Sequence, residues 1–358
     1  MLSTLRLLNF RCFEQLVLDF SPRGAIFTGD NAQGKTSVLE AICLLIRLHS
    51  PRTRRLKDLA KFGGSGFGIS GQAWDCENQV RFQSGKGLSL KIDGEDVERQ
   101  RDYLASGGLL VWMANDDLDL VRGSSSSRRR YLDFIGTQLW PDYRLSLGYY
   151  SHALKCRNRL LKAPQLDSRS LAAYEQLLVD HGTRLIEFRK ELVDHLKPFI
   201  AKAQAKISGT NETFDLEYQS QEEGLSIQSL SDERDRDRQR GSTQRGPHRD
   251  DLSLQLNGQA AASFASEGQQ RTLSISLKLA QGTLLRTHTK RLPIYLIDDV
   301  FGELDSRRRQ ALIEYLPTDA QTLITTTQLD WLDQSSSLAP LPLFHVDQAR
   351  ISPINRTT

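Results

Sequence analysis

One eight-residue stretch near the start of the chain constrains its fold more than any other feature. Gly29 to Thr36 reads GDNAQGKT, which fits the phosphate-binding pattern GxxxxGK[ST]. The apolar stretch Gly24 to Thr28 precedes it, and Thr36 to Leu48 carries apolar residues at helical spacing. Strand, glycine loop and helix are the context that such a loop requires. The sequence therefore predicts an α/β fold that binds ATP on this loop.

The pattern assigns a role to the residues of the loop. Its glycines let backbone N–H groups turn toward the phosphates, and the N-terminus of the following helix favours anions. We expect Lys35 to reach the β- and γ-phosphates and to assist catalysis, and Thr36 to bind Mg²⁺. The predicted ATP-binding residues are Gly29, Asp30, Asn31, Ala32, Gln33, Gly34, Lys35, Thr36 and Ser37. ATP and Mg²⁺ are the expected cofactors.

A second element of the site lies far along the chain. The apolar stretch Ile294 to Ile297 is followed by Asp298 and Asp299. In proteins with a phosphate-binding loop, the first carboxylate at such a strand end holds Mg²⁺, and the second can orient or deprotonate the attacking water. Plain strands also end in paired aspartates, but here the pair occurs together with GDNAQGKT. We therefore predict Asp298, with Thr36, as the metal site and Asp299 as a catalytic residue.

The segment SEGQQ, residues Ser266 to Gln270, lies between these two elements and directly before a long predicted helix. Ser266 and Gln269 can form a capping box, which is the plain explanation. The order of the three elements, however, is that of ABC-type ATPases. In that class the Ser-x-Gly motif binds the γ-phosphate of the nucleotide held by the opposite subunit. Ser266, Gly268 and Gln269 are therefore the predicted trans signature motif.

The residues after the acidic strand fit the same class. Val300 to Asp305 reads VFGELD and matches the D-loop of ABC-type ATPases, with Glu303 and Asp305 as its candidate residues. Together with the signature motif, this match predicts an ATP-dependent homodimer that holds two ATP molecules at its interface.

Two basic clusters are candidates for contact with DNA. The formal net charge of +3 permits nucleic-acid binding without arguing for it. A solvated surface explains each cluster equally well, whereas the functional interpretation is salt-dependent, sequence-tolerant contact with phosphates. The DNA-contact candidates are Arg54, Arg55, Arg128, Arg129 and Arg130.

The sequence contains no sign of a membrane or secretory segment. No apolar run approaches the eighteen or so residues of a membrane span. The first residues are interrupted by Arg6, Asn9 and Arg11, which suits a strand better than a signal peptide. The 4 cysteines are widely spaced and fit reduced thiols. We expect a cytoplasmic protein without a membrane partner.

The pattern along the chain predicts an ABC-type ATPase head with a mixed sheet and a flanking β-meander over 65–100, interrupted by a mainly helical lobe. Ser170 to Lys206 is expected to be helical, with a kink or restart at Pro198. Ser231 to Gln244, rich in alternating charges, is expected to be a solvated helix end or a disordered loop. The predicted division is an ATPase domain in two parts, 1–112 and 235–358, with a helical insertion over 113–234.

Taken in order, these residues resemble one family, the RecF family of bacterial recombination and gap-repair ATPases. The resemblance runs over nearly the whole chain, and GPHRDDL is its most specific string. The strings that carry it are LRLLNFRCFEQLVLDF, NAQGKTSVLEAICLL, DDLDLVRGSSSSRRRYLD, ALKCRNRLLK, GPHRDDL, SEGQQRTLSISLKLAQ and LIDDVFGELDSRRR.

The resemblance implies more than the residues themselves do. It implies a head without a long coiled coil, similar to the heads of chromosome-segregation ATPases. It implies ATP-dependent dimerisation at gapped DNA, where single and double strands meet, and work with RecO and RecR to load RecA. Nucleoid association, a part in SOS induction and a weak, DNA-stimulated ATPase used as a switch also follow from it. Arg52 is expected near the nucleotide.

The chain departs from the family pattern at a few positions. Residues Asn115 to Asp117 replace a usual Pro-Glu-Asp string, and threonines (ITTTQ) follow the stretch Thr322 to Thr325 where transporter ATPases carry a histidine. Asp299 stands where faster ABC enzymes have glutamate, so its carboxylate lies one methylene further back. The missing histidine and the shorter carboxylate of Asp299 both predict slow hydrolysis.

Other classes explain less of the sequence. The ATP-binding subunit of a transporter, or another ABC-headed ATPase, shares the motif order but gives the helical insertion no role. An ABC-headed nuclease needs a further carboxylate cluster for two metals. A phosphate-loop kinase accounts for Lys35 and Asp298 but not for Ser266 to Gln270.

Overall fold

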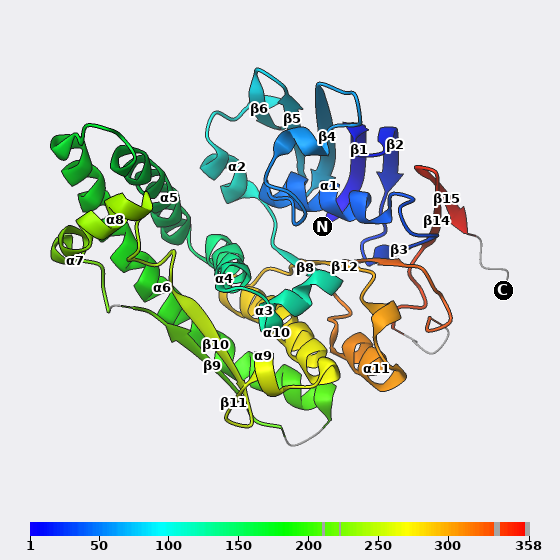
Figure 1. Ribbon diagram of the computed structural model, residues 1–358. Coiled ribbons are helices and arrows are strands. Elements are labelled where there is room, and N and C mark those ends of the chain that lie inside the picture. Colours follow the sequence, from blue (N-terminus) through cyan, green and yellow to red (C-terminus); the bar gives the residue numbers. More distant parts are fainter. Residues whose placement is uncertain (210–211, 222, 333–336, 355–358) are drawn as a thin grey trace. The chain divides into compact units, whose positions relative to one another are not determined.

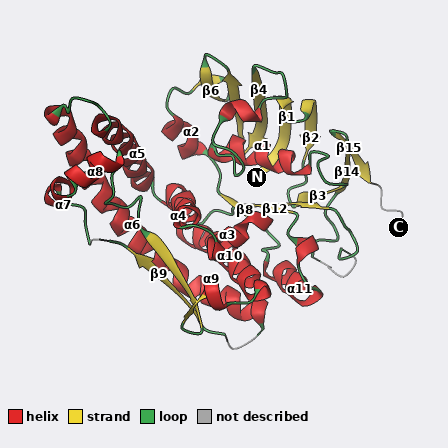
Figure 2. Cartoon of the chain, viewed as in Figure 1, coloured by secondary structure: helices red, strands yellow, loops and turns green. Residues whose placement is uncertain are grey.

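The computed structural model describes residues 1–209, 212–221, 223–332 and 337–354 of the chain (Figure 1). They form two compact units. We call Met1–Asp117 together with Leu285–Thr358 the outer unit, and Leu118–Leu284 the inserted unit. Figure 2 shows strands concentrated in the outer unit and helices in the inserted one. This mixed α/β architecture confirms the predicted fold class.

The division differs from the expected one at its second boundary. We expected residues 235–358 to rejoin the ATPase domain, but residues up to Leu284 pack with the inserted unit. The reason is strand pairing: β10 (Asp251–Leu256) is antiparallel to β9 (Phe214–Gln219) along its whole length. Because β9 belongs to the inserted unit, its pairing with β10 places β10 in the same unit.

A largely parallel six-stranded sheet forms the centre of the outer unit. In spatial order its strands are β15 (Arg350–Ile354), β14 (Leu343–Asp347), β3 (Gly24–Thr28), β13 (Thr322–Thr326), β12 (Ile294–Asp298) and β8 (Leu110–Ala114). All pairs are parallel except β14 with β15 at the edge. Every residue of β3 and β13 is buried, as expected for strands covered on both faces. The carboxyl ends of β3, β12 and β13 therefore meet at one edge.

A second, antiparallel sheet is the expected strand pair and β-meander. In spatial order its strands are β2 (Phe13–Asp19), β1 (Leu2–Phe10), β4 (Gly66–Ala73), β5 (Cys76–Gln83), β6 (Gly87–Ile92) and β7 (Glu95–Asp96). The apolar residues align across the first pair, with Leu5 opposite Leu18 and Leu7 opposite Leu16. Such same-face apolar pairs fix the register of the sheet.

Helix α1 (Lys35–Arg47) lies between the two sheets (Figure 1). It contacts β8, β12 and β13 of one sheet and β1, β4 and β5 of the other. All of its residues except Thr36 are buried, which explains why its sequence is apolar on every side. The outer unit also contains η1 (Leu56–Leu59), α2 (Gln100–Ser106), η3 (Phe301–Glu303) and α11 (Ser306–Tyr315).

Long helices build the inserted unit. Helix α6 runs through Pro198 without a break, although we expected a kink or restart there. Its N-terminus is capped by Asp167, whose carboxylate accepts from Arg169 N and Ser170 N. The unit contains α3 (Asp119–Arg122), α4 (Ser125–Leu139), α5 (Pro141–Leu161), α6 (Ser168–Ser208), α7 (Ile227–Asp232), α8 (Arg234–Arg240), β11 (Gln259–Ala260), α9 (Ala261–Phe264) and most of α10 (Glu267–Thr289), and η2 (Asn115–Leu118) leads into it. None of the helices in the described part of the chain has the length and apolarity to cross a membrane.

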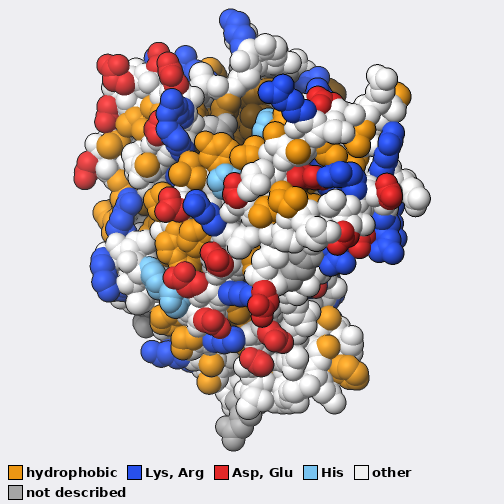
Figure 3. Space-filling view, turned by 90° about the vertical axis from the view of Figure 1, so that its left-hand side faces the viewer, with side chains coloured by type: hydrophobic (Ala, Val, Ile, Leu, Met, Phe, Trp, Pro, Cys, Tyr) orange, Lys and Arg blue, Asp and Glu red, His pale blue; other side chains and the backbone are white. Residues whose placement is uncertain are grey.

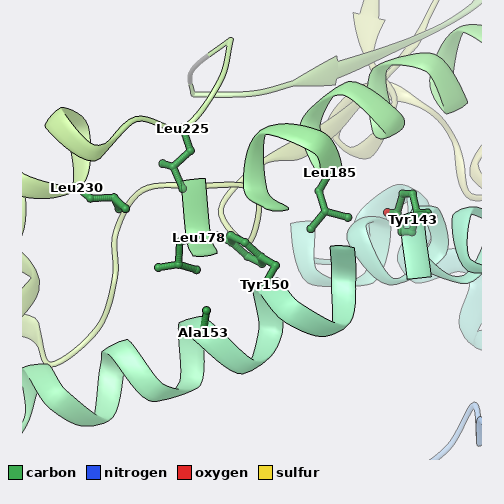
Figure 4. Close-up of a cluster of buried hydrophobic side chains, with 7 residues drawn as sticks. All are labelled: Tyr143, Tyr150, Ala153, Leu178, Leu185, Leu225 and Leu230. Atoms are coloured by element: carbon green, nitrogen blue, oxygen red, sulfur yellow. The ribbon is translucent and has the colours of Figure 1, made fainter. Parts of the chain in front are cut away.

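Apolar side chains of α5 and α6 form a core of the inserted unit (Figure 4). Tyr150 on α5 projects toward Leu178 and packs against Gly182 on α6, and Leu225, between β9 and α7, packs against the same glycine. This packing holds the two helices side by side, since buried apolar area is the main source of stability.

Residues 231–244, expected to be a solvated helix end or a disordered loop, contain the helix α8, most of whose residues are exposed, but Asp237 and Arg234 join a buried ion cluster. Asp237 on α8 and Arg157 on α5 are both fully buried and pair at 2.6 Å. Arg157 also pairs with the buried Glu175 of α6 at 3.0 Å, and Arg234 reaches the other oxygen of Glu175 at 2.8 Å. The buried pairing was not predicted, because an alternating charge pattern looks the same whether its partners are water or buried ions. This cluster fastens α8 to α5 and α6.

The string GPHRDDL at residues 246–252 lies within the inserted unit as a compact turn. The His248 ring bridges the Tyr150 hydroxyl (2.6 Å from Nδ1) and the Thr243 carbonyl (2.9 Å from Nε2). One neutral tautomer satisfies both contacts, with Nε2–H donating to the carbonyl and the hydroxyl donating to Nδ1. Gly246 has φ +119°, and a Cβ there would lie 2.5 Å from the Tyr150 oxygen. The string is therefore an internal connector.

The stability of the protein should fall as the pH falls through the titration range of His248. Burial lowers the pKa of His248 to about 4 from its ordinary 6.5. Because the folded pKa is depressed, the stabilisation is fully present above pH 6.5 and is lost as the pH falls toward 4. The expected loss is on the order of 3 kcal/mol, measured by urea unfolding at several pH values. His248→Gln should flatten this dependence, and His152→Gln, at an exposed histidine of the same unit, should not. Equal pH profiles for the wild type and His248→Gln contradict this account.

Candidate functional site

The phosphate-binding loop connects β3 to α1 with a backbone that only small residues tolerate. Gly29 has φ +146°, and a Cβ there would lie 2.2 Å from the Val346 carbonyl oxygen. Gly34 has φ +115°, with the Cys12 sulfur 2.8 Å from the position of a Cβ. Ala32 between them also has positive φ, at +65°. Successive residues of this kind form a concave backbone that binds anions, in agreement with the sequence pattern.

Lys35 lies over this loop. Its Nζ donates to the carbonyl oxygens of Gly29 (2.6 Å) and Asp30 (2.8 Å). Burial lowers the pKa of the ammonium, while the nearby carboxylates of Asp299 and Asp298 act against that shift. The ammonium is thus positioned at the concave face of the loop, where the phosphates of a nucleotide bind.

The carboxylate of Asp298 joins the loop to the far end of the chain. Its Oδ1 accepts from the Thr36 hydroxyl at 2.8 Å and from the Thr325 hydroxyl at 2.7 Å. Burial raises the pKa of Asp298, and these two hydrogen bonds oppose the rise. A hydroxyl and a carboxylate at hydrogen-bond distance are hard oxygen ligands of the kind that Mg²⁺ prefers. The residues present fit a magnesium site.

Asp299 differs from Asp298 in backbone and in surroundings. Its φ of +55° breaks the strand alternation, and its N–H donates to the Thr325 carbonyl at 3.1 Å. Asn115, at the end of β8, donates to the Asp299 carbonyl at 3.2 Å. The Oδ1 of Asp299 is buried without a hydrogen-bond partner among the described residues. Burial raises the pKa of this carboxylate, and Lys35 acts against the rise. A buried carboxylate oxygen without a hydrogen-bond partner is unfavourable, and such an oxygen marks a position where a water can be held.

These residues open onto a cavity of about 940 Å³ in the outer unit. Its walls come from the phosphate loop, the β1–β2 turn, the ends of β12 and β13, and the segment that follows α1. Arg52, expected near the nucleotide, lines the cavity together with Arg55 and Lys57. The lining residues are Arg11, Cys12, Asn31, Ala32, Gly34, Lys35, Thr36, Ser37, Arg52, Arg55, Lys57, Asp58, Ala60, Lys61, Phe62, Gly63, Gly64, Asp298, Asp299 and Thr325.

A buried carboxylate on α1 anchors the basic wall of this cavity. Glu40 is fully buried and accepts from Arg11 through Nε (2.8 Å) and Nη2 (2.7 Å). The Ser50 hydroxyl donates to it at 2.6 Å, and Arg52 lies 4.0 Å away. Glu40 and Thr325 were not among the predicted site residues. For Glu40 a signal existed, because an isolated carboxylate within an otherwise apolar helix needs a partner.

The signature segment is a capped helix start in the inserted unit. Gln269 N–H donates to the Ser266 hydroxyl at 3.3 Å, and Ser266 N–H donates to Gln269 Oε1 at 2.8 Å. These reciprocal bonds are the capping box expected from the spacing. Gln269 Nε2 also donates to Glu212 at 2.8 Å. Ser266 itself is exposed, whereas Gly268 is half-buried, so the serine remains available to a ligand.

The candidate D-loop follows the acidic strand end. Glu303 is exposed at the end of η3, and the Asp305 carboxylate caps α11 by accepting from Arg308 N–H at 2.8 Å. Phe301 is buried and stacks on Trp331 with ring centroids 4.4 Å apart. This stack ties the D-loop to the segment that follows β13.

The DNA-contact candidates occupy different environments. Arg128 pairs with both carboxylate oxygens of Asp251 (2.7 and 2.8 Å), and Arg129 donates to the Asp250 carbonyl. These two arginines are used within the inserted unit, whereas Arg130 is exposed. Arg54 and Arg55, in the outer unit, are exposed as well. In Figure 3, basic and acidic side chains are interspersed over the visible face.

Comparison with known proteins defines the class first. Residues 1–349 match the family model described as RecF/RecN/SMC N terminal domain. The Smc head bound to the C-winged helix domain of ScpA shares the fold, with a TM-score of 0.57 at 13% identity over 99% of this chain and 98% of that one. The chain thus has the ATPase-head fold of this class.

Within that class, the chain belongs to the RecF family. It is 35% identical to the DNA replication and repair protein RecF of Streptococcus suis, over 98% of this chain and 99% of that protein. Identity to RecF of Streptococcus pneumoniae is 36%, over 92% and 93%. The solved structure of the recombination mediator protein RecF-ATPrS in the RecFOR pathway matches with a TM-score of 0.86 at 26% identity, over 99% and 98%. These matches support the DNA-repair interpretation over a transporter subunit.

Proposed function

We propose that this protein is an ATP-controlled DNA-repair protein that acts as a slow switch. The observation that carries the proposal is the contact of Thr36 with Asp298, which joins a phosphate-binding loop to an acidic strand end across 262 residues of sequence. Asp299, with its unpaired and buried oxygen, completes an arrangement suited to hydrolysis of a phosphoanhydride.

Each residue of the site has a role in this proposal. The loop from Gly29 to Ser37 binds the phosphates of ATP, and Lys35 neutralises charge on the β- and γ-phosphates. Thr36 and Asp298 hold Mg²⁺, which supplies further charge neutralisation there. Asp299 orients the attacking water and accepts its proton. A short carboxylate, together with threonines at the switch position, makes hydrolysis slow.

The exposed signature segment supports dimerisation in this proposal. In the proposed dimer, Ser266, Gly268 and Gln269 of one subunit contact the γ-phosphate on the other, with Glu303 and Asp305 beside the paired sites. Backbone N–H groups at a helix start suit this role. We propose gapped DNA, at junctions of single and double strands, as the substrate, with Arg54, Arg55 and Arg130 as candidate contacts.

The family context supports the partners. The similar RecF structure is that of a recombination mediator protein in the RecFOR pathway, so we propose RecO and RecR as partners of this chain in loading RecA. This role places the protein in the cytoplasm at the nucleoid, where it takes part in recombinational repair, replication restart and SOS induction.

Assembly state gives the first test of this function. We expect the wild type to dimerise with ATP and Mg²⁺, and Lys35→Met and Ser266→Arg to stay monomeric. Lys35→Met removes a phosphate contact, and Ser266→Arg places a bulky cation at the proposed trans contact. Size-exclusion chromatography with light scattering, with and without gapped DNA, measures this.

A conservative variant controls for the substitution itself. Ser266→Thr keeps the hydroxyl and the cap, so it should still dimerise. A wild type that binds ATP yet stays monomeric at high concentration, with and without gapped DNA, contradicts the trans contact of Ser266 but leaves ATP binding in place.

A further inference from the structure

A single aromatic side chain lies at the rim of the cavity beside the phosphate loop. Phe62 lines this cavity, and its relative exposure is 103%. Among the described residues that line the cavity, it is the one aromatic ring. An exposed phenylalanine elsewhere on a surface needs no explanation. At a nucleotide cavity, however, an aromatic face is a direct partner for a base.

The backbone holds Phe62 at a defined corner. The Gly64 N–H donates to the Lys61 carbonyl at 2.7 Å, and Gly63 has φ +80°. This is the pattern of a type II turn with Phe62 at its second position. Lys61 is fixed on both sides, because its N–H donates to the Asn9 carbonyl at 2.8 Å and its ammonium pairs with Glu14 at 2.7 Å. The ring thus stands on an anchored turn.

The turn that carries Phe62 and the catalytic residues belong to different parts of the cavity lining. Thr36 and Asp298 mark the position of the metal and the terminal phosphates. The β1–β2 turn comes next, where Cys12 packs against Gly34 of the loop. That turn is bridged to the segment after η1 by the pair Phe10 and Ala60, two residues before Phe62. Phe62 therefore lines the same cavity as the phosphate loop, outside the residues that the phosphates and the metal would occupy.

We propose that Phe62 is the base platform of the ATP site, stacking on the adenine ring. The proposal rests on the ATP-binding function above and adds a residue that the phosphate-loop pattern does not contain. Stacking uses the face of a base, and every base has such a face. Phe62 therefore contributes affinity for nucleotides in general and leaves the distinction between adenine and guanine to other groups.

Nucleotide titrations with matched variants test the proposal. Binding of ATP, GTP and inorganic tripolyphosphate is measured by calorimetry at a protein concentration where light scattering gives a monomer. Phe62→Ala is expected to weaken ATP and GTP by about tenfold, the usual scale of a base–aromatic stack. Its affinity for tripolyphosphate should equal that of the wild type. Phe62→Tyr keeps an aromatic face and should restore ATP binding.

The controls separate the possible failures. Tyr149→Ala removes another exposed aromatic ring, in the inserted unit, and should leave all affinities unchanged. Unchanged ATP affinity in Phe62→Ala overturns the proposal, and so does an equal loss for ATP and tripolyphosphate, which would mean that the loop itself has moved. A wild type that binds neither ATP nor tripolyphosphate contradicts the proposed function instead.

Discussion

Asp299→Asn is expected to lower the rate of ATP hydrolysis by at least about a hundredfold while leaving ATP affinity within about threefold. The amide keeps the size of the side chain but cannot accept a proton from water. Binding should persist because the phosphate contacts come from the loop, and Asp298 still accepts from Thr36 and Thr325. Phosphate release with gapped DNA measures the rate, and calorimetry measures the affinity.

The same variant should accumulate as the ATP-bound dimer, since hydrolysis ends that state in the proposed cycle. Asp96→Asn is the matched control, because it makes the same change at an exposed carboxylate on β7 that does not line the cavity. Hydrolysis by Asp299→Asn at the wild-type rate contradicts the assignment of Asp299 as the group that accepts a proton from the attacking water. Loss of ATP binding in Asp299→Asn assigns it to the nucleotide pocket instead.

Arg157→Met is expected to destabilise the inserted unit by about 3–5 kcal/mol. Arg157 compensates the carboxylates of Asp237 and Glu175, which are buried with it. Removing the cation leaves two buried negative charges, one of them reached by Arg234 alone. Hydrogen exchange followed by mass spectrometry, on peptides from α5, α6 and α8, reports the free energy of opening for this unit.

An ion pair whose cation is exposed to solvent provides the comparison. Arg236 pairs with Glu233 at 3.1 Å, with the Arg236 side chain 66% exposed. Arg236→Met should therefore cost less than about 1 kcal/mol, because water solvates the Arg236 guanidinium and Glu233 keeps its pair with Arg245 at 3.2 Å. Equal effects of the two arginine substitutions contradict the assignment of Arg157 as a buried hub. Adding Asp237→Asn to Arg157→Met should recover part of the loss.

The sequence was most informative where function depends on a short continuous string. The phosphate loop needs positive φ at Gly29 and Gly34, and glycine is the residue that adopts this conformation most readily. The acidic strand end is also local, because four apolar residues before Asp298 suffice to indicate a buried strand. Their contact in space follows once both strands belong to one parallel sheet.

The buried polar contacts could not be predicted, because their partners lie far apart in the sequence. Glu40 and Asp237 find their arginines 29 and 80 residues away, and no local pattern states such a pairing. Thr325 is one of three threonines in the buried strand β13, and only the register of β13 beside β12 brings its hydroxyl to Asp298. Arg128, predicted as a DNA contact, likewise pairs with a carboxylate that is distant in the sequence, that of Asp251.

The placement of β3 has a consequence for how the protein is made. This strand is synthesised early, yet both of its neighbours in the sheet, β13 and β14, leave the ribosome near the end of translation. At roughly 5–20 residues per second, the 262 residues between Thr36 and Asp298 take on the order of ten to fifty seconds to appear. The strands of the antiparallel sheet and the segments of the inserted unit are synthesised closer in time to the segments that they pack against. An apolar strand therefore waits unpaired through most of synthesis, the state in which chains need chaperones.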